Sequence, residues 1–206
     1  MNMTTAIVRP TAEQYRAPQA SVTLPTPRAT FYFMVETLVA KGLAKYEHAD
    51  PFRNRLPTIL FLLVPPKPEE FDLSHLVSLI EVDGKRGLNY LDPGHLTEEI
   101  KVPDGPYLMV DIEDGRARLN TKPSVSSANI ANENRSPYTT WRGIVHAVVF
   151  PEVFQGHNID LVGSRYESEG VPYLFLNGRR PELHVCWCDD AHPEWGAPSC
   201  GSVIVP

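Results

Sequence analysis

Proline is the residue type that most restricts what this chain can fold into. The chain has 20 prolines among its 206 residues, about twice the usual share of roughly 5%. Because proline fixes φ and lacks a backbone N–H, it ends helices and is excluded from central strands. We therefore expect short helices and strands joined by many turns. A chain of this length is long enough for one domain and too short for two of comfortable size.

The composition is typical of a globular protein. Hydrophobic residues make up 42% of the chain and charged residues 21%, which excludes wholesale disorder and a fibrous chain. The formal net charge is -6. This charge argues against nucleic acid or an anionic membrane surface as the main partner, since both repel a negatively charged protein.

No segment has the length and composition of a membrane anchor. The longest apolar run, Ile59–Val64, is far below the roughly 20 residues needed to cross a bilayer. Residues Met1–Pro25 contain no apolar run of the signal-peptide type. The three cysteines are an odd number and cannot form a closed set of intrachain disulfides. We therefore expect a cytoplasmic protein with reduced thiols and no membrane partner.

The beginning of the chain differs from the rest. Four prolines lie among polar residues between Met1 and Arg28. This pattern predicts a loosely held arm over residues 1–28, followed by a single domain over residues 29–206.

Hydrophobic periodicity predicts about four helices in this domain. Thr30 is a candidate N-cap for the first helix, and Thr139 or Thr140 is suited to cap the last one, which ends before Pro151. The predicted helices cover residues 31–45, 69–82, 124–133 and 139–150.

Short apolar segments predict the strands. Ile59–Val64, stopped by two prolines, has the pattern of a strand buried on both faces, and Asn177-Gly178 is typical of a hairpin. The other predicted strands cover residues 107–112 (with a hairpin-like turn into 116–120), 159–164, 171–176 and 182–188. Helices come early and strands late, without a repeating strand–helix unit. The predicted fold class is therefore α+β, with a mixed or antiparallel sheet.

The three cysteines lie close together near the C-terminus. In a strand over residues 182–188, His184, Cys186 and Cys188 share one face. Thiolates and imidazole are ligands that suit Zn²⁺. The sequence therefore offers one candidate zinc site, whose potential ligands are Cys186, Cys188, His192 and Cys200.

Two other interpretations apply to the same segment. Free cysteine is among the most buried residue types, so core packing, without a metal, is the interpretation that we favour over zinc. A third is nucleophilic catalysis, in which His192 acts as the base for Cys186 or Cys200 and Asp189 or Asp190 orients it. A disulfide between neighbouring same-face positions is disfavoured, because extended geometry holds their Cα atoms near the outer limit for bridging.

Charged residues elsewhere supply weaker candidates. Asp111, Glu113 and Asp114 gather near a predicted strand end, where carboxylates serve acid–base chemistry or hold a cation. A solvated turn is the alternative for these acids. Arg165 is a second candidate for a pocket, together with Asp111.

Several segments of the second half resemble a family of uncharacterised bacterial proteins, known as a domain of unknown function. The resemblance covers roughly residues 58–201. Cys188 has no counterpart in the family pattern, and Glu194 stands where an aromatic residue is usual. The segments that carry the resemblance are Gly84–Gly87, Pro103–Asp111, Arg135–Thr139, Phe150–Glu152, Gly163–Arg165, Val171-Pro172, Cys186-Trp187, His192 and Ser199–Gly201.

The resemblance implies an intracellular domain and supplies no reaction. It leaves Cys186, His192 and Cys200 as the candidate metal ligands, and three ligands suit an open catalytic zinc better than a closed structural one. We predict a small-molecule-binding or catalytic protein with a pocket beside the C-terminal strands. Cys186, His192, Cys200, Asp111 and Arg165 are its candidate catalytic residues. The alternative is a non-catalytic interaction module, in which the Pro-rich arm and the loop around Trp195 bind another protein.

Overall fold

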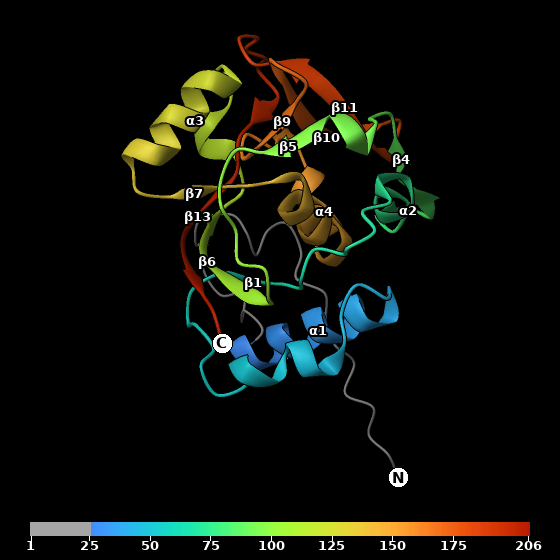
Figure 1. Cartoon of the computed structure of the whole chain (residues 1–206), viewed down its shortest axis with the longest axis vertical. Coiled ribbons are helices and arrows are strands. Elements are labelled where there is room, and N and C mark those ends of the chain that lie inside the picture. The colour runs from blue at the N-terminus through green and yellow to red at the C-terminus, as the bar shows by residue number, and fades with distance from the viewer. Residues whose placement is uncertain (1–25) are drawn as a thin grey trace.

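Two β-sheets with helix α4 between them form the body of the protein (Figure 1). The computed structural model describes residues 26–206. In these residues four α-helices combine with antiparallel and mixed sheets in a single domain, which confirms the predicted α+β class. The α-helices are α1 (Pro27–Ala40), α2 (Leu73–Ser78), α3 (Pro123–Asn132) and α4 (Thr140–Val149). Single-turn 3₁₀-helices are η2 (Tyr46–His48), η3 (Asp50–Phe52), η4 (Pro93–His95), η5 (Arg116–Arg118) and η6 (Pro151–Phe154).

The first sheet is antiparallel and has the order β1-β6-β13-β7. Its long central strand, β6, pairs with β1 on one side and with the C-terminal strand β13 on the other. The sheet therefore joins segments that are far apart in the sequence. Its strands are β1 (Phe61–Val64), β6 (Tyr107–Glu113), β7 (Ser136–Pro137) and β13 (Ser199–Ile204).

The second sheet, here called the C-terminal sheet, has the order β12-β8-β10-β11-β4. The hairpin β10–β11 forms its centre, and β4 and β12 run parallel to their neighbours, so the sheet is mixed. Its strands are β4 (Leu88–Asn89), β8 (Asn158–Asp160), β10 (Gly170–Asn177), β11 (Arg180–Trp187) and β12 (Trp195–Gly196), extended by β5 (Leu96–Glu98) and β9 (Ser164–Tyr166). A separate two-stranded ribbon consists of β2 (Glu81–Val82) and β3 (Lys85–Arg86).

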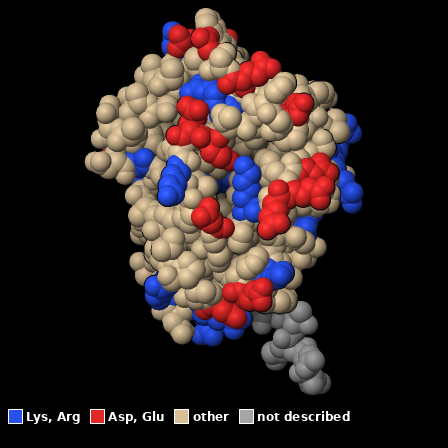
Figure 2. All heavy atoms as spheres, viewed as in Figure 1, with Lys and Arg blue, Asp and Glu red and all other residues tan. Residues whose placement is uncertain are grey.

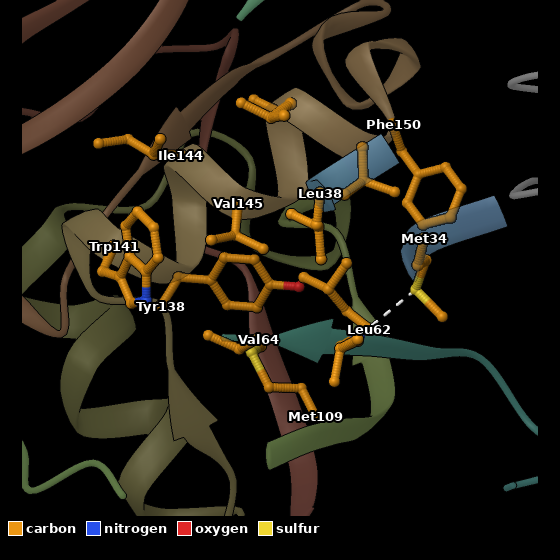
Figure 3. Close-up of a cluster of buried hydrophobic side chains, with 14 of the residues drawn as sticks. Met34, Leu38, Leu62, Val64, Met109, Tyr138, Trp141, Ile144, Val145 and Phe150 are labelled. Carbon is orange, nitrogen blue, oxygen red and sulfur yellow. Dashed lines mark hydrogen bonds between the residues drawn. The ribbon is translucent and has the colours of Figure 1, made fainter. Parts of the chain in front are cut away.

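Helix α4 is buried along its whole length. Thr139 caps its N-terminus by accepting a hydrogen bond from the Arg142 backbone N–H, as predicted. Figure 3 shows Trp141, Ile144 and Val145 of α4 among the buried side chains of α1 and of the first sheet. Because both sheets and α1 pack on this helix, it holds the two halves of the domain together.

Several predicted boundaries are wrong. Helix α1 begins at Pro27 and is capped by Thr26, not Thr30, since proline is favourable in the first turn of a helix. Helix α2 is much shorter than the predicted helix over residues 69–82. The last two residues of that predicted range, Glu81 and Val82, form β2 instead. The segment after β6 is η5 and not a returning strand.

Other predictions are confirmed, apart from details. All four residues of β1 are buried, although Ile59 and Leu60 before it are exposed. The β10–β11 hairpin forms at Asn177-Gly178. Its two loop residues are Gly178 and Arg179, both with positive φ.

The predicted arm lies outside the described residues except for its last three, and Pro27 and Arg28 belong to α1. Among residues 26–206, no helix is long and apolar enough to span a membrane.

Candidate functional site

A polar cavity of about 430 Å³ lies where the end of β6, η5 and α3 meet. This volume is within the range of small-molecule sites, roughly 300–1,000 Å³. Three carboxylates and two guanidinium groups line it, which leaves a net single negative charge. The lining residues are Asp111, Ile112, Glu113, Ala117, Arg118, Thr121, Asn129, Glu133 and Arg135.

Asp111 has an unusual backbone conformation. Its φ is 59° although it lies within β6, a conformation that few residues other than glycine, asparagine and aspartate adopt. On the neighbouring strand β13, Cys200 pairs with Ile112 and Ser202 with Val110, so Gly201 lies beside Asp111. A Cβ atom at Gly201 would be 2.4 Å from Asp111 Oδ2. The glycine therefore provides the space in which the carboxylate lies.

Arg135 connects this carboxylate to β13. Its guanidinium donates to Asp111 Oδ2 and to the Asp111 carbonyl, each at 2.5 Å, and to Ser199 Oγ at 2.8 Å. The segments around Asp111, Arg135 and Ser199, which belong to three different strands or their ends, are thus joined by one side chain. Each of them is also a segment that carries the family resemblance.

Arg118 makes a second set of ion pairs on the other side of the cavity. It is buried, and its guanidinium donates to Glu113 of β6 and to Glu133 just after α3. A buried guanidinium is stabilised only if its neighbours accept its hydrogen bonds. In the described part of the chain, Arg118 Nε is buried with no acceptor. Through their ion pairs and hydrogen bonds, Arg118 and Arg135 together connect β6, α3 and β13 around the cavity.

The cavity offers acceptors to a ligand more readily than donors. The terminal nitrogens of Arg118 and Arg135 already bond to carboxylate, carbonyl or hydroxyl oxygens. Within residues 26–206, no hydrogen bond reaches Asp111 Oδ1 or Glu133 Oε1. Both side chains are about half exposed, so these oxygens can accept from a bound molecule. Figure 2 shows acidic and basic side chains interspersed over one face of the protein, without a large area of one sign.

The structure separates the candidate metal ligands. Cys200 belongs to the main hydrophobic core, whereas Cys186 lies in a second cluster that includes Ile130, Val162 and Val171. His192 is exposed and stacks on Trp195 with 5.0 Å between ring centroids. In the described residues, no three His, Cys, Asp or Glu side chains are grouped as metal ligands. Zinc binding by these residues stays a prediction, and their positions do not support it.

Neither buried thiol has the properties of a nucleophile. Burial raises the pKa of Cys186 and of Cys200 above the ordinary value for a thiol. Cys186 Sγ lies 3.5 Å from the Val171 carbonyl, to which it donates. A thiol with a raised pKa is protonated near neutral pH and is therefore a poor nucleophile.

Of the five predicted catalytic residues, Asp111 is the one that lines the cavity. Arg165 lies on β9, where it pairs with Glu99 at 3.6 Å. The cavity residues that the sequence analysis missed are Arg118, Glu133 and Arg135. Arg135 was part of the resemblance, but its partner Ser199 is 64 residues away, and no sequence spacing predicts such a contact.

One buried carboxyl group lies outside the cavity. Asp160 of β8 is fully buried, and within residues 26–206 neither of its oxygens has a hydrogen-bond partner. Burial raises the pKa of Asp160 from 3.8 to about 7. This group can therefore change its protonation state near neutral pH.

Comparison with known proteins identifies a family but no activity. A family profile described as "Family of unknown function (DUF5701)" matches residues 18–205. No curated protein and no solved structure matches the chain.

Proposed function

The chain belongs to the DUF5701 family of unknown function, and we propose that it binds a small polar molecule, rich in hydrogen-bond donors, in the polar cavity. The observation that carries this proposal is the imbalance between donors and acceptors. The arginine N–H groups are largely bonded within the protein, while Asp111 and Glu133 each present a half-exposed carboxylate oxygen that accepts no hydrogen bond from residues 26–206.

The charge of the cavity favours a neutral or cationic ligand over an anion. Three carboxylates face two guanidinium groups, and an added carboxylate or phosphate would compete with Asp111, Glu113 and Glu133 for the arginines. An ammonium group or several hydroxyl groups would instead donate to the carboxylates. Hydrogen bonds to charged acceptors are about twice as strong as neutral ones.

The proposed role is binding without covalent chemistry by the cysteines. In the described part of the chain, the lining contains no cysteine, serine or histidine, and its hydroxyl group belongs to Thr121. Ser199, which touches Arg135, uses its oxygen to accept from that side chain. The geometry therefore supports recognition of a ligand more directly than it supports a reaction.

Three probes with the same sugar ring and different charges test this proposal. We expect glucosamine to bind more tightly than glucose, and glucose more tightly than glucuronate, in titrations followed by amide chemical shifts of Ala117 and Asn129. The opposite order would mean that the arginines and not the carboxylates select the ligand. The absence of shifts with all three probes would contradict the proposal.

A substitution links the binding to the cavity. Glu133→Gln keeps the shape of the side chain but removes its charge, so we expect it to weaken glucosamine binding by about tenfold. Asp50→Asn is the matched control, because Asp50 forms an exposed ion pair with Arg53, outside the cavity. Equal affinities of both variants and the unmodified protein would contradict the assignment of the site.

A further inference from the structure

A row of aromatic and histidine rings crosses one face of the C-terminal sheet. Consecutive rings lie close together, with Tyr90 4.2 Å from His184, Tyr173 4.6 Å from Trp195, and His192 5.0 Å from Trp195 between centroids. The link in the middle, Tyr173 to His184, is 6.1 Å. The row, here called the aromatic row, consists of Tyr90, His184, Phe175, Tyr173, Trp195 and His192.

The register of the strands explains why these rings share a face. Tyr173 of β10 pairs with His184 of β11 and with Asp160 of β8, and residues directly opposite each other point to the same side of a sheet. The row runs from β12 to the residue after β4, that is, across five strands. At about 4.8 Å between strands, this is on the order of 19 Å, the length of several residues of an extended peptide.

The row is accessible to a partner. Tyr90 is 58% exposed, His192 is exposed, and Phe175, Tyr173, His184 and Trp195 are partly exposed. Aromatic side chains at a surface are enriched where proteins bind one another. Tyr173 and Trp195 also pack against the second hydrophobic cluster, but core packing does not account for the exposed rings of Tyr90 and His192 at the two ends of the row.

The charge at the end of the row formed by His192 and Trp195 favours a cationic partner. Residues 181–206 contain four acidic residues, Glu182, Asp189, Asp190 and Glu194, and no lysine or arginine. Within residues 26–206, neither Asp190 nor Glu194 forms an ion pair. Both are exposed, and each lies two positions from His192 in the chain. A guanidinium group is attracted both to the face of an aromatic ring and to a nearby carboxylate.

The loop that carries this end of the row is held in place by its backbone. The Asn120 N–H donates to the carbonyls of His192 and Trp195, each at 3.2 Å, and the Asn158 N–H donates to the Glu194 carbonyl at 2.6 Å. A surface that is already ordered loses less conformational entropy when a partner binds.

We propose that the aromatic row and its acidic border bind an arginine-containing segment of another protein. The arginine side chain stacks on the exposed ring of His192, whose other face lies on Trp195, and pairs with Asp190 or Glu194. This surface is separate from the polar cavity, and its role does not depend on a ligand there. A stretch of single-stranded nucleic acid, which also stacks on aromatic rings, is disfavoured by the same carboxylates.

Peptide binding to the full-length chain tests this proposal. The probe is a short peptide in which arginine alternates with glycine, and its control is the same peptide with citrulline, the neutral analogue of arginine. We expect the arginine peptide to bind about tenfold more tightly than the citrulline peptide, as measured by calorimetry. Equal affinities, or tighter binding of oligothymidylate, would overturn the proposal.

Matched variants separate the row from a general effect of negative charge. We expect Asp190→Asn/Glu194→Gln to weaken binding of the arginine peptide about tenfold, and His192→Ala to weaken it to a smaller extent. Asp104→Asn/Glu70→Gln removes the same charge from exposed loops outside the C-terminal sheet, and Trp187→Ser removes an exposed ring from the opposite face of β11. Equal losses in the row variants and in these controls would overturn the proposal.

Discussion

The polar cavity and the face of the C-terminal sheet accommodate buried charge in different ways. In the cavity, the buried guanidinium of Arg118 is paired with Glu113 and Glu133. On the sheet, Asp160 is buried just as deeply, but within residues 26–206 its oxygens have no partner, and burial raises its pKa to about 7. Ion pairs offset the cost of burying a charge, whereas burial without a partner favours the neutral form of a carboxyl group. The cavity thus compensates its buried charge with ion pairs, whereas the sheet buries Asp160 without one among the described residues.

The pH dependence of stability gives the largest expected contrast. Asp160 has a pKa of about 7 in the fold and 3.8 as the ordinary value, so unfolding releases a proton between these two pH values. Stability due to this group therefore falls as the pH rises from about 4 to 7. We expect the free energy of unfolding of Asp160→Asn, relative to the unmodified protein, to increase by on the order of 4 kcal/mol across this window, as measured by chemical denaturation.

The contributions of other titrating groups to the free energy of unfolding cancel when Asp160→Asn is compared with the unmodified protein. Burial lowers the pKa of His146 to about 3 and that of His157 to about 4, and both are present in either protein. Burial and, to a smaller extent, the charge of Asp160 raise the pKa of Tyr173 and of Cys186, and both groups titrate well above the window. A relative stability that does not change with pH would show that Asp160 keeps an ordinary pKa.

Removing the paired charge in the cavity has the next largest effect. Arg118→Met leaves Glu113 and Glu133 without their guanidinium partner, and we expect the free energy of unfolding to fall by about 3 kcal/mol at pH 7. The control is Arg53→Met, which breaks an exposed pair with Asp50 and is expected to cost less than about 1 kcal/mol. Equal losses in both variants would mean that burial does not strengthen the Arg118 pairs.

A smaller change tests the space beside Asp111. A Cβ atom at Gly201 would be 2.4 Å from the Asp111 carboxylate, so Gly201→Ala displaces this side chain from Arg135. We expect a loss of about 2 kcal/mol in the free energy of unfolding and weaker glucosamine binding. Gly105→Ala is the control, since nothing lies within 4 Å of a Cβ at that position. Unchanged stability and affinity in Gly201→Ala would contradict the close fit.

The smallest expected effect concerns the backbone of Asp111. Asparagine adopts a positive φ more readily than alanine does, by about 1 kcal/mol. Thermal denaturation of Asp111→Asn and Asp111→Ala should therefore show the alanine variant to be the less stable one by about this amount. The reverse order would mean that the positive φ is not maintained in solution.

Local signals in the sequence predicted many elements correctly. The predicted α4, with Thr139 or Thr140 as its cap, and the hairpin at Asn177-Gly178 both follow from residues that are neighbours in the chain. Where prediction failed, a nearby signal or a distant partner overrode the periodicity. Pro27 lets α1 begin before the predicted start at residue 31. Glu81 and Val82, predicted as the end of a helix, instead form β2, which pairs with β3.

The candidate site was much less predictable than the fold. The position of Asp111 near a predicted strand end makes it a candidate site residue from the sequence. Arg118 and Arg135 are not candidates on the same grounds, because neither is part of a sequence motif that indicates a function. The cysteines, which attracted the metal and nucleophile hypotheses, lie in two separate hydrophobic clusters. Proximity in the sequence did not translate into proximity in space, since β11 and β13 belong to different sheets.

The sequence by itself determined the α+β class, most helices and the central hairpin, because these depend on interactions between residues a few positions apart. The tertiary structure alone decided which charges meet. Arg135 reaches Ser199 across 64 positions, and Asp160 lies opposite Tyr173 with no partner for its carboxyl group among residues 26–206. The free energy of such a charge depends on burial and on neighbours that only the folded chain supplies.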